Sequence, residues 1–281
     1  MYSHSSASVP DRGRLSLKNS VGMAGRDLVL ALSVKADEYP ERLTLAVDNG
    51  FALEYTPDPL QPELIVPQVT PYLREGVPIR FHCRFGQHEL GNTDPEEAGL
   101  ALDVHERIFD TIAGLGEPFV TVHLNLNKRI SFDKERGIDN LGRLVAYGRQ
   151  CGLTVCLENL RQGPTSDPAN VLNWARTTGA SITLDIGHAV SSDSVRGGTH
   201  TVTGFVDLFR ERLAEAHVYG KEEDRHYPIT DMASLTPVID RLLETNCAWW
   251  TIELDSIEDA LDTRMRLINY LTTRKAGTTD D

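Results

Sequence analysis

The stretch TVCLENLRQG, Thr154 to Gly163, places a carboxylate and an amide directly after four residues that have the composition of a buried strand. A buried charge is unfavourable unless it is paired or binds a metal. Folding alone therefore gives little reason for Glu158 to follow this run. Glu158 is either a solvated strand end or a side chain that points into a site.

Runs of this β type alternate along the chain with amphipathic stretches of helical periodicity. The β-type runs are residues 28–34, 51–56, 78–85, 119–126, 154–160, 181–188, 215–220 and 249–255. Strands that alternate with helices indicate parallel β-α-β units. Eight such units in 281 residues predict a single (β/α)8 TIM barrel, a fold of about 250 residues. A doubly wound sheet is the alternative, but it usually has fewer strands, and no G-x-G-x-x-G motif opens a helix here.

The barrel is expected to occupy residues 26–272. Residues 1–25 are Ser-rich and lack the apolar segment of a signal peptide, so we expect them to form a flexible leader, in which Met23 could be the natural start. Residues 273–281 are expected to form a disordered tail.

The net charge, the apolar runs and the cysteines of the sequence indicate which kinds of partner and which cellular location to expect. The net charge is −13, and an acidic surface repels phosphate backbones, so nucleic acid is not expected as a general partner unless a local basic surface overrides this balance. No run reaches the roughly 18 apolar residues of a membrane span. The four cysteines form no C-x-x-C pair, and Cys83 and Cys156 lie in strand-like runs. This pattern predicts reduced thiols and a cytoplasmic protein.

Side chains that can bind metals end six successive β-type runs, from the third to the eighth. Active sites of TIM barrels lie at the C-terminal ends of the strands, so these side chains are expected to converge. His188 follows Asp185 three residues later in D-I-G-H, and a D-x-H arrangement in the loop after the seventh run adds two more. The candidate ligands are His82, His123, Glu158, Asp185, His188, His217, Asp224, His226 and Glu253. Taken singly, each could be a hydrogen-bonded structural residue or a helix cap, but the set is harder to explain in that way.

Imidazole nitrogens and carboxylate oxygens in one pocket can bind Zn²⁺, Mn²⁺ or Fe²⁺. One divalent ion takes about four to six ligands. Nine candidates therefore predict two or three ions, with zinc favoured and Glu158 as a central bridging carboxylate. The remaining histidines, which lie in the leader, in loops or on a helix, are expected to have structural or solvent roles. They are His4, His88, His105 and His200.

In this order the candidate ligands resemble those of the xylose-isomerase-like TIM-barrel superfamily, which also contains the endonuclease-IV-type AP endonucleases. The resemblance covers about residues 27–271. It is carried by L-E-N at the fifth strand, D-x-G-H at the sixth, His at the seventh, D-x-H beyond it and Glu at the eighth. The sequence departs from the family after the D-x-H pair, where H-Y-P-I-T-D lacks the usual glycines.

The resemblance implies two possible ligand sets. Sugar isomerases and epimerases of the superfamily hold one metal, with two glutamates that also move protons. Here these ligands would be Glu158, Asp185, His217 and Glu253. The endonuclease-IV type has a trinuclear zinc cluster. In that set His82 and His123 would hold one ion, and Asp185, His217 and Glu253 a second. The third ion would be held by His188, Asp224 and His226.

Because all nine positions are filled, the resemblance favours hydrolysis of a phosphodiester, with Glu158 and Glu253 as catalytic residues. The acidic balance and the lack of a long basic loop favour a small phosphorylated metabolite over duplex DNA, as in the cobamide-remodelling hydrolases of the superfamily. Side chains near the strand ends are expected to bind substrate phosphate. They are Arg84, Lys128, Arg161 and Arg225, together with Arg129 and Lys221.

Three alternatives remain open. The first is a one-metal isomerase or epimerase, in which Glu158 and Glu253 form the acid–base pair. The second is an AP endonuclease. The third is a barrel that binds a ligand without catalysis, which would hold no tight metal.

Overall fold

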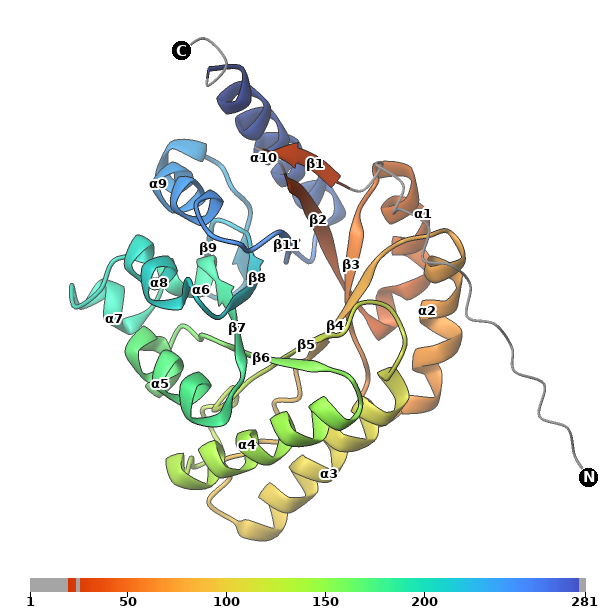
Figure 1. Cartoon of the computed structure of the whole chain (residues 1–281), viewed down its shortest axis with the longest axis vertical. Helices are drawn as coiled ribbons and strands as arrows, with labels where there is room; N and C mark the ends of the chain where they lie inside the picture. Colours follow the sequence, from red (N-terminus) through yellow and green to blue (C-terminus); the bar gives the residue numbers. More distant parts are fainter. Residues whose placement is uncertain (1–19, 24–25, 278–281) are drawn as a thin grey trace, which may run out of the picture.

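The structure, a computed structural model, describes residues 20–23 and 26–277 (Figure 1). The predicted TIM barrel is confirmed: parallel strands run in the order β2-β11-β8-β7-β6-β5-β4-β3, and β2 pairs with β3 to close the ring. The barrel strands are β2 (Arg26–Lys35), β3 (Ala52–Thr56), β4 (Ile79–Cys83), β5 (Phe119–Val122), β6 (Thr154–Glu158), β7 (Ser181–Asp185), β8 (Leu213–His217) and β11 (Trp249–Ile252).

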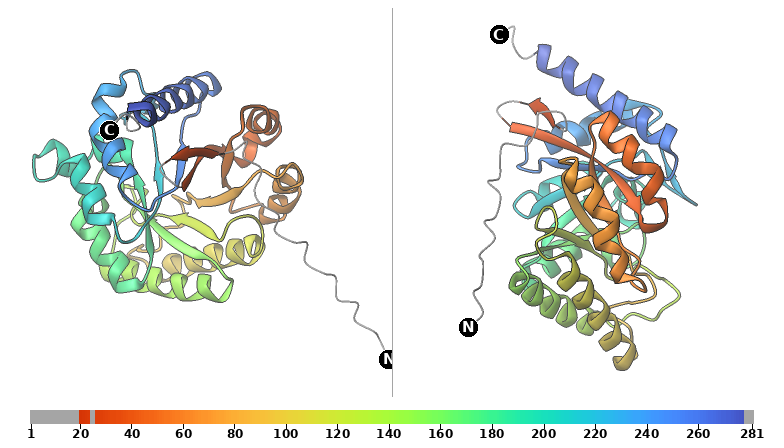
Figure 2. Two further views of the ribbon diagram at one scale, coloured as in Figure 1. Left: turned by 45° about the horizontal axis from the view of Figure 1, so that its top comes forward. Right: turned by 90° about the vertical axis from the view of Figure 1, so that its right-hand side faces the viewer.

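Helices surround the barrel (Figure 2). In chain order they are η2 (Ala36–Glu38), α1 (Tyr39–Asn49), η3 (Pro62–Leu64), α2 (Ile65–Arg74), α3 (Pro95–Ile112), α4 (Lys134–Gln150), η4 (Pro164–Ser166), α5 (Pro168–Thr178), α8 (Val202–Phe209), α9 (Met232–Leu243) and α10 (Ile257–Gly277). Asp94, Asp133 and Asp167 cap α3, α4 and α5 by accepting first-turn backbone N–H groups, which fixes where three of the strand-to-helix loops end. None of the helices in the described part of the chain is long and apolar enough to cross a membrane.

Two regions near the predicted site differ from the sequence prediction. The sixth run was predicted as a strand through His188, but β7 ends at Asp185 because this carboxylate caps a helix, α6 (Ile186–Val190), by accepting the His188 N–H at 2.6 Å. A second short helix, α7 (Asp193–Arg196), follows. The loop after β8 contains a hairpin of β9 (Lys221–Glu222) and β10 (His226–Tyr227).

The two ends of the chain also differ from the prediction where they are described. Within the predicted leader, residues 20–23 form strand β1 (Ser20–Met23), which pairs antiparallel with β2. Residues 1–19 and 24–25 of that leader lie outside the described residues, as do residues 278–281 of the predicted tail. Helix α10 continues to Gly277, beyond the predicted barrel end at residue 272.

The barrel interior is polar below the predicted site. Arg80 of β4 is buried between the rings of Phe119 and Trp249, with its guanidinium carbon 4.0 and 4.4 Å from their centroids. It forms an ion pair with Glu215 of β8, with Nη1 and Oε2 3.2 Å apart. Glu215 Oε1 also accepts from the Thr251 hydroxyl at 2.6 Å. This buried charge pair is therefore hydrogen-bonded on several sides, as a buried pair must be to be tolerated.

The connection from α3 to β5 depends on a close backbone approach at Gly116. This residue has φ +64°, and a Cβ there would lie 2.4 Å from the carbonyl oxygen of Ile79. The next residue, Glu117, donates its N–H to the same oxygen at 2.7 Å. Gly116 thus allows the start of β5 to lie against β4. Gly114 also has a positive φ, +77°, but a Cβ there would meet no atom within 4 Å.

We expect Gly116→Ala to lower the free energy of unfolding by about 3 kcal/mol, because it adds a backbone clash to the strain of a positive φ. Gly114→Ala is the matched control, with the strain alone, and is expected to cost about 1 kcal/mol. Urea unfolding followed by circular dichroism measures both values. Equal losses in the two variants would show that the close approach to Ile79 does not matter.

Candidate metal centre

Six predicted ligands project into the barrel at the C-terminal ends of their strands, and all six are buried. Four are on the strands themselves and two lie one residue beyond a strand end. The first four are His82, Glu158, Asp185 and His217, and the other two are His123 and Glu253. The barrel therefore brings together side chains that are up to 171 residues apart in sequence (253 − 82).

His82, His123 and Glu158 form the first group. The Nε2 atoms of His82 and His123 lie 3.3 and 3.1 Å from Glu158 Oε2, and 3.3 Å from each other. One zinc ion with ligand bonds of about 2.0–2.2 Å can contact three atoms at this spacing.

Glu158, Asp185, His217 and Glu253 form the second group, whose ligand atoms all lie within 4.8 Å of one another. His217 Nδ1 lies 3.0 Å from Glu253 Oε2, 3.6 Å from Glu158 Oε2 and 3.7 Å from Asp185 Oδ2. Glu158 belongs to both groups, so its position suits a bridging carboxylate.

His188, Glu222 and His226 form the third group, and here the structure corrects the predicted ligand Asp224. Glu222 Oε2 lies 3.4 Å from His188 Nε2, whereas Asp224 is exposed and accepts a hydrogen bond from the Tyr227 hydroxyl at 2.8 Å. The cause is the hairpin register. Glu222 and His226 are directly opposite each other across β9 and β10, so their side chains share a face, and Asp224 lies in the turn between the strands. The D-x-H motif indicated Asp224, which the structure does not bring into this group.

Backbone carbonyls orient two of the candidate ligand histidines. His188 Nδ1 donates to Asn159 O at 2.9 Å, and His226 Nδ1 donates to Glu253 O at 3.0 Å. A neutral imidazole has one N–H and one lone pair, so both residues keep Nε2 as the nitrogen that can bind a metal. Acceptors of this kind behind a ligand histidine are typical of metal sites.

Tyr219 supports the third group from below. Its ring stacks on His226 with centroids 4.3 Å apart, and its hydroxyl donates to Asp185 Oδ2 at 3.0 Å. Gly187 of the D-x-G-H motif makes this arrangement possible, because a Cβ at that position would lie 2.0 Å from the Tyr219 ring. The glycine of the motif therefore has a packing role at the site.

The donor atoms fit a divalent cation. Both oxygens of Glu158, with His217 Nδ1 and Glu253 Oε2, are buried and have no hydrogen-bond partner among the described residues. Buried polar atoms without a partner are costly, and a bound cation would satisfy all four. Burial would raise the pKa of the Glu158 carboxyl, but the facing imidazoles of His123 and His217 hold its pKa well below the usual range. Glu158 is therefore ionised and can act as a metal ligand.

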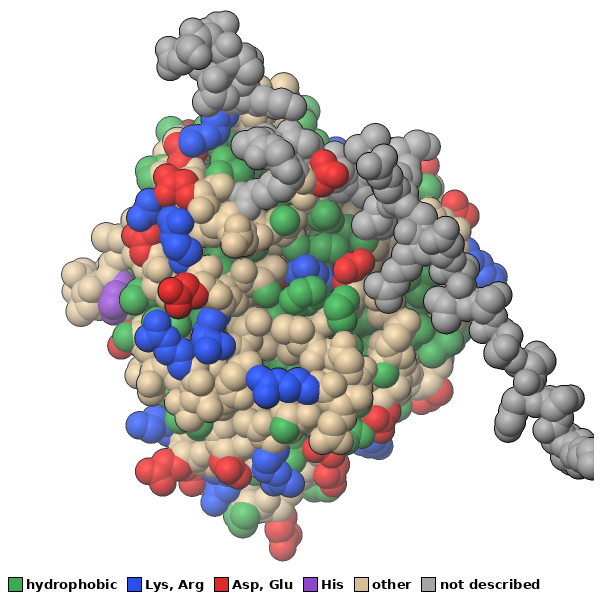
Figure 3. Space-filling model, viewed as in Figure 1, with side chains coloured by type: hydrophobic (Ala, Val, Ile, Leu, Met, Phe, Trp, Pro, Cys, Tyr) green, Lys and Arg blue, Asp and Glu red, His purple; other side chains and the backbone are tan. Residues whose placement is uncertain are grey.

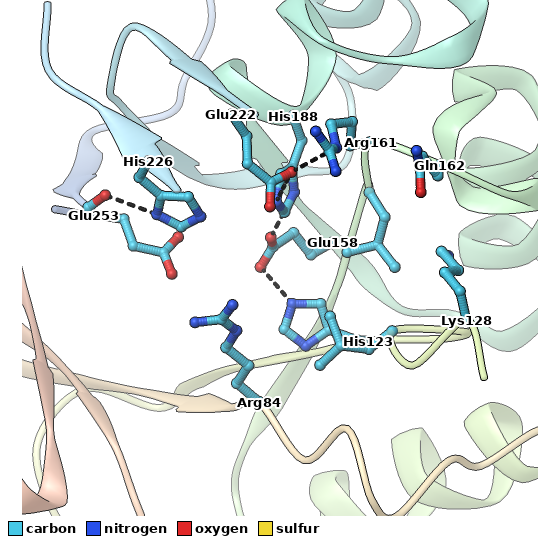
Figure 4. A pocket seen from close by; sticks show the side chains of 12 residues that line it. Arg84, His123, Lys128, Glu158, Arg161, Gln162, His188, Glu222, His226 and Glu253 are labelled. Carbon is cyan, nitrogen blue, oxygen red and sulfur yellow. Dashed lines mark hydrogen bonds and ion pairs between the residues drawn. The ribbon is translucent and has the colours of Figure 1, made fainter. Parts of the chain in front are cut away.

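Three of the predicted phosphate-binding residues line a cavity above these groups, of about 170 Å³: Arg84, Lys128 and Arg161 (Figure 4). Lys128 Nζ donates to Asn125 Oδ1 at 3.0 Å. Glu89, which the sequence did not indicate, accepts the Asn125 N–H at 2.9 Å and so holds the loop that carries Lys128.

The other three basic candidates lie farther out. Arg225 lines an adjoining outer cavity, and its guanidinium carbon lies 4.9 Å from the centre of the Tyr227 ring. Lys221 is exposed and forms an ion pair with Glu223 at 2.6 Å. Arg129 is also exposed and lines neither cavity. The structure therefore does not bring Lys221 and Arg129 to the site.

Comparisons with known proteins agree with the TIM-barrel fold. The profile of the xylose isomerase-like TIM barrel family matches residues 51–271. An uncharacterized protein of Methanocaldococcus jannaschii is 32% identical over 157 residues, which cover 56% of this chain and 68% of that protein. A D-tagatose 3-epimerase-like protein has a similar structure, with a TM-score of 0.72, 18% identity and coverage of 88% and 99% of the two chains. Endonuclease IV from Thermus thermophilus is also similar in structure, with a TM-score of 0.63 and 15% identity. The match covers 87% of this chain and 99% of that protein.

We expect Glu222→Gln to lower the content of tightly bound zinc by about one ion per chain, because the third group would lose its anionic ligand. Asp224→Asn is the matched control and should leave the zinc content unchanged. Both are measured by plasma mass spectrometry on protein purified without chelator. Loss of zinc in Asp224→Asn, with full zinc in Glu222→Gln, would restore Asp224 as the ligand.

Proposed function

Because the chain belongs to the xylose isomerase-like TIM barrel family, we propose that it is a metal-dependent hydrolase of a phosphodiester in a small phosphorylated metabolite. The observation that carries this proposal is the presence of more than one candidate metal-binding group, including the three groups described above. An isomerase that uses one ion would need only the second group. The first and third groups would then have no role in its chemistry.

The proposed enzyme holds two or three divalent ions, with zinc favoured over manganese and iron because the ligand set combines imidazole and carboxylate. When bound, such ions stabilise charge on phosphate oxygens and lower the pKa of water. The first group would hold one ion, the second group another and the third group the last. The first group is His82, His123 and Glu158, and the second is Glu158, Asp185, His217 and Glu253. The third is His188, Glu222 and His226.

Glu158 and Glu253 are the proposed catalytic residues. Both line the cavity, and the neighbouring imidazoles favour the ionised form of both. Burial would raise the pKa of the Glu253 carboxyl, but the imidazoles of His226 and His217 hold it well below its usual range. Glu158 lies between the first and second groups, where its carboxylate can orient the attacking water. Glu253, at the edge of the cavity, can accept the proton that this water loses.

Arg84, Lys128 and Arg161 would bind the substrate phosphate. Figure 4 shows the Arg84 guanidinium directed toward the space beside Glu158 and Glu253. It makes no ion pair with another described residue, so its N–H groups are available to a substrate. A guanidinium can donate two parallel hydrogen bonds to a phosphate, so Arg84 is well placed to bind a phosphodiester that enters this cavity.

The preference for a small substrate follows from surface charge. The net charge is −13, and on the face drawn in Figure 3 the Lys and Arg side chains are scattered, with Asp and Glu between them. Binding to a nucleic-acid backbone requires several phosphate contacts from Lys and Arg. A small phosphorylated metabolite needs only the cations that line the cavity. A cobamide is one substrate of this class, and a cytoplasmic location remains part of the proposal.

An isomerase or epimerase is the second candidate. The second group alone supplies a complete ligand set for one ion, with Glu158 and Glu253 as a pair of carboxylates that could move a proton next to a carbonyl. The fold likeness to a D-tagatose 3-epimerase-like protein keeps this reading open. The likeness to endonuclease IV does the same for AP endonuclease activity.

The reaction classes are separated by parallel assays of zinc-loaded protein. We expect hydrolysis of a simple phosphodiester, bis(4-nitrophenyl) phosphate, because the cavity cations and the metal groups all act on the phosphate itself. Little cleavage of abasic duplex DNA and no change in a ketohexose are expected under the same conditions. Epimerisation of the ketohexose with one ion per chain would replace the hydrolase proposal by the isomerase. Cleavage of abasic DNA that falls steeply with added salt would overturn the choice of a small substrate.

His226→Ala tests the multinuclear site. In the hydrolase the variant should lose about one zinc ion per chain and at least about 100-fold in turnover, equivalent to roughly 2.7 kcal/mol. The surface residue His200, which contacts Asp167 at 3.4 Å, supplies the control His200→Ala, which should lose neither. A suitable readout is plasma mass spectrometry together with the phosphodiester assay. Full zinc content and near-normal hydrolysis in His226→Ala would rule out a role for the third group.

A further inference from the structure

Glu54 of β3 is a buried carboxylate that contacts ligands from both strand-borne metal groups. Its side chain has no solvent exposure. Oε1 lies 3.0 Å from His217 Nε2, and Oε2 lies 3.5 Å from His82 Nδ1. Glu54 therefore contacts one imidazole of the first group and one of the second.

In both histidines the nitrogen that faces Glu54 is the one that points away from the metal groups. His82 directs Nε2 to Glu158 and Nδ1 to Glu54. His217 directs Nδ1 to Glu253 and Glu158, and Nε2 to Glu54. A neutral imidazole that binds a metal through one nitrogen carries its proton on the other. The two N–H groups therefore point at the two oxygens of one carboxylate.

Other acceptors cannot take this role. His82 Nδ1 has no hydrogen-bond partner among the described residues, and neither does Glu54 Oε2, so a slight closing of their 3.5 Å separation satisfies both. Glu215 Oε1 lies 3.9 Å from His217 Nε2, beyond hydrogen-bond distance, and accepts from the Thr251 hydroxyl.

We propose that Glu54 is a positioning residue that couples the first and second metal groups, by accepting one N–H from His82 and one from His217 and thereby fixing both rings as ligands. The inference rests on the metal centre of the proposed function but not on its reaction. Glu54, His82 and His217 also lie close enough together to hold an ion directly. That arrangement would require a second lone pair from each imidazole, which the neutral ring does not have.

The proposed role requires a side chain with two hydrogen-bond acceptors at position 54. A carboxylate offers two acceptor oxygens, whereas a glutamine of the same shape offers one acceptor oxygen and one NH₂ donor. Glu54→Gln can therefore satisfy only one of the two N–H groups. The other ring must turn or change tautomer, and its group then loses a correctly oriented ligand. A change that conserves shape should thus weaken metal binding.

The test measures Zn²⁺ affinity by competition with a chromophoric chelator, and the ligand field by the visible spectrum of the Co²⁺-loaded protein. We expect Glu54→Gln to lower the affinity for at least one Zn²⁺ ion by about 10- to 100-fold and to change the Co²⁺ spectrum. The metal-free variant should unfold at the same urea concentration as the metal-free wild type. Glu89→Gln is the matched control. It alters a carboxylate that is also buried, but one that accepts backbone N–H groups outside the three metal groups, so Zn²⁺ affinity and the Co²⁺ spectrum should stay unchanged.

Zn²⁺ affinities and a Co²⁺ spectrum in Glu54→Gln equal to those of the wild type would overturn the inference. The wild-type chain provides a second measurement if that variant does not fold. In ¹⁵N-histidine-labelled, zinc-loaded protein, NMR should show His82 with its proton on Nδ1 and His217 with its proton on Nε2, and the opposite tautomer in either ring would overturn the inference. A wild-type protein that binds no Zn²⁺ would instead refute the proposed metal centre itself.

Discussion

The ionised carboxylate of Glu158, buried at the centre of the barrel, is the constraint around which the site is arranged. Its oxygens lie 3.1–3.6 Å from nitrogens of four histidines, on β4, just after β5, on α6 and on β8. A buried charge must be compensated. Burial would lower the pKa of the His82, His188 and His217 imidazoles, but the carboxylates around them raise it, so protonated rings supply part of this compensation and a cation held in common would supply it in their place. The two oxygens without hydrogen bonds mark where that compensation is incomplete in the protein alone.

The polar interior below Glu158 follows from the geometry of strands. Side chains two residues apart on a strand point to the same side, so the residue two positions before each ligand also points into the barrel. On β4 and β8 these residues are Arg80 and Glu215, which pair with each other, and on β5 and β7 they are Thr121 and Thr183, whose hydroxyls are 2.8 Å apart. The ligands therefore stand on a hydrogen-bonded layer and not on an apolar one that could shift.

The same fold supports different reactions, because activity in a TIM barrel resides in the side chains at the strand ends and in the loops that follow. The second group belongs to the barrel strands and would suit an isomerase as well as a hydrolase. The third group depends on α6 and on the β9–β10 hairpin, elements that the barrel does not require. The choice between the reactions therefore rests on loop residues such as His188, Glu222 and His226.

Local patterns in the sequence determined the barrel and most of the candidate ligands. Alternating strand and helix periodicity identified eight units, and the position of a polar residue at a strand end identified candidates such as His82 and Glu158. Two decisions required tertiary structure. Glu222 takes the place of Asp224 among the candidate ligands because a hairpin register sets which carboxylate shares a face with His226. Glu54 lies inside an apolar run, and its role exists only where barrel closure brings β3 beside β4 and near β8. Strand-end position can be read from neighbours in sequence, whereas a contact across 163 residues depends on how the sheet closes.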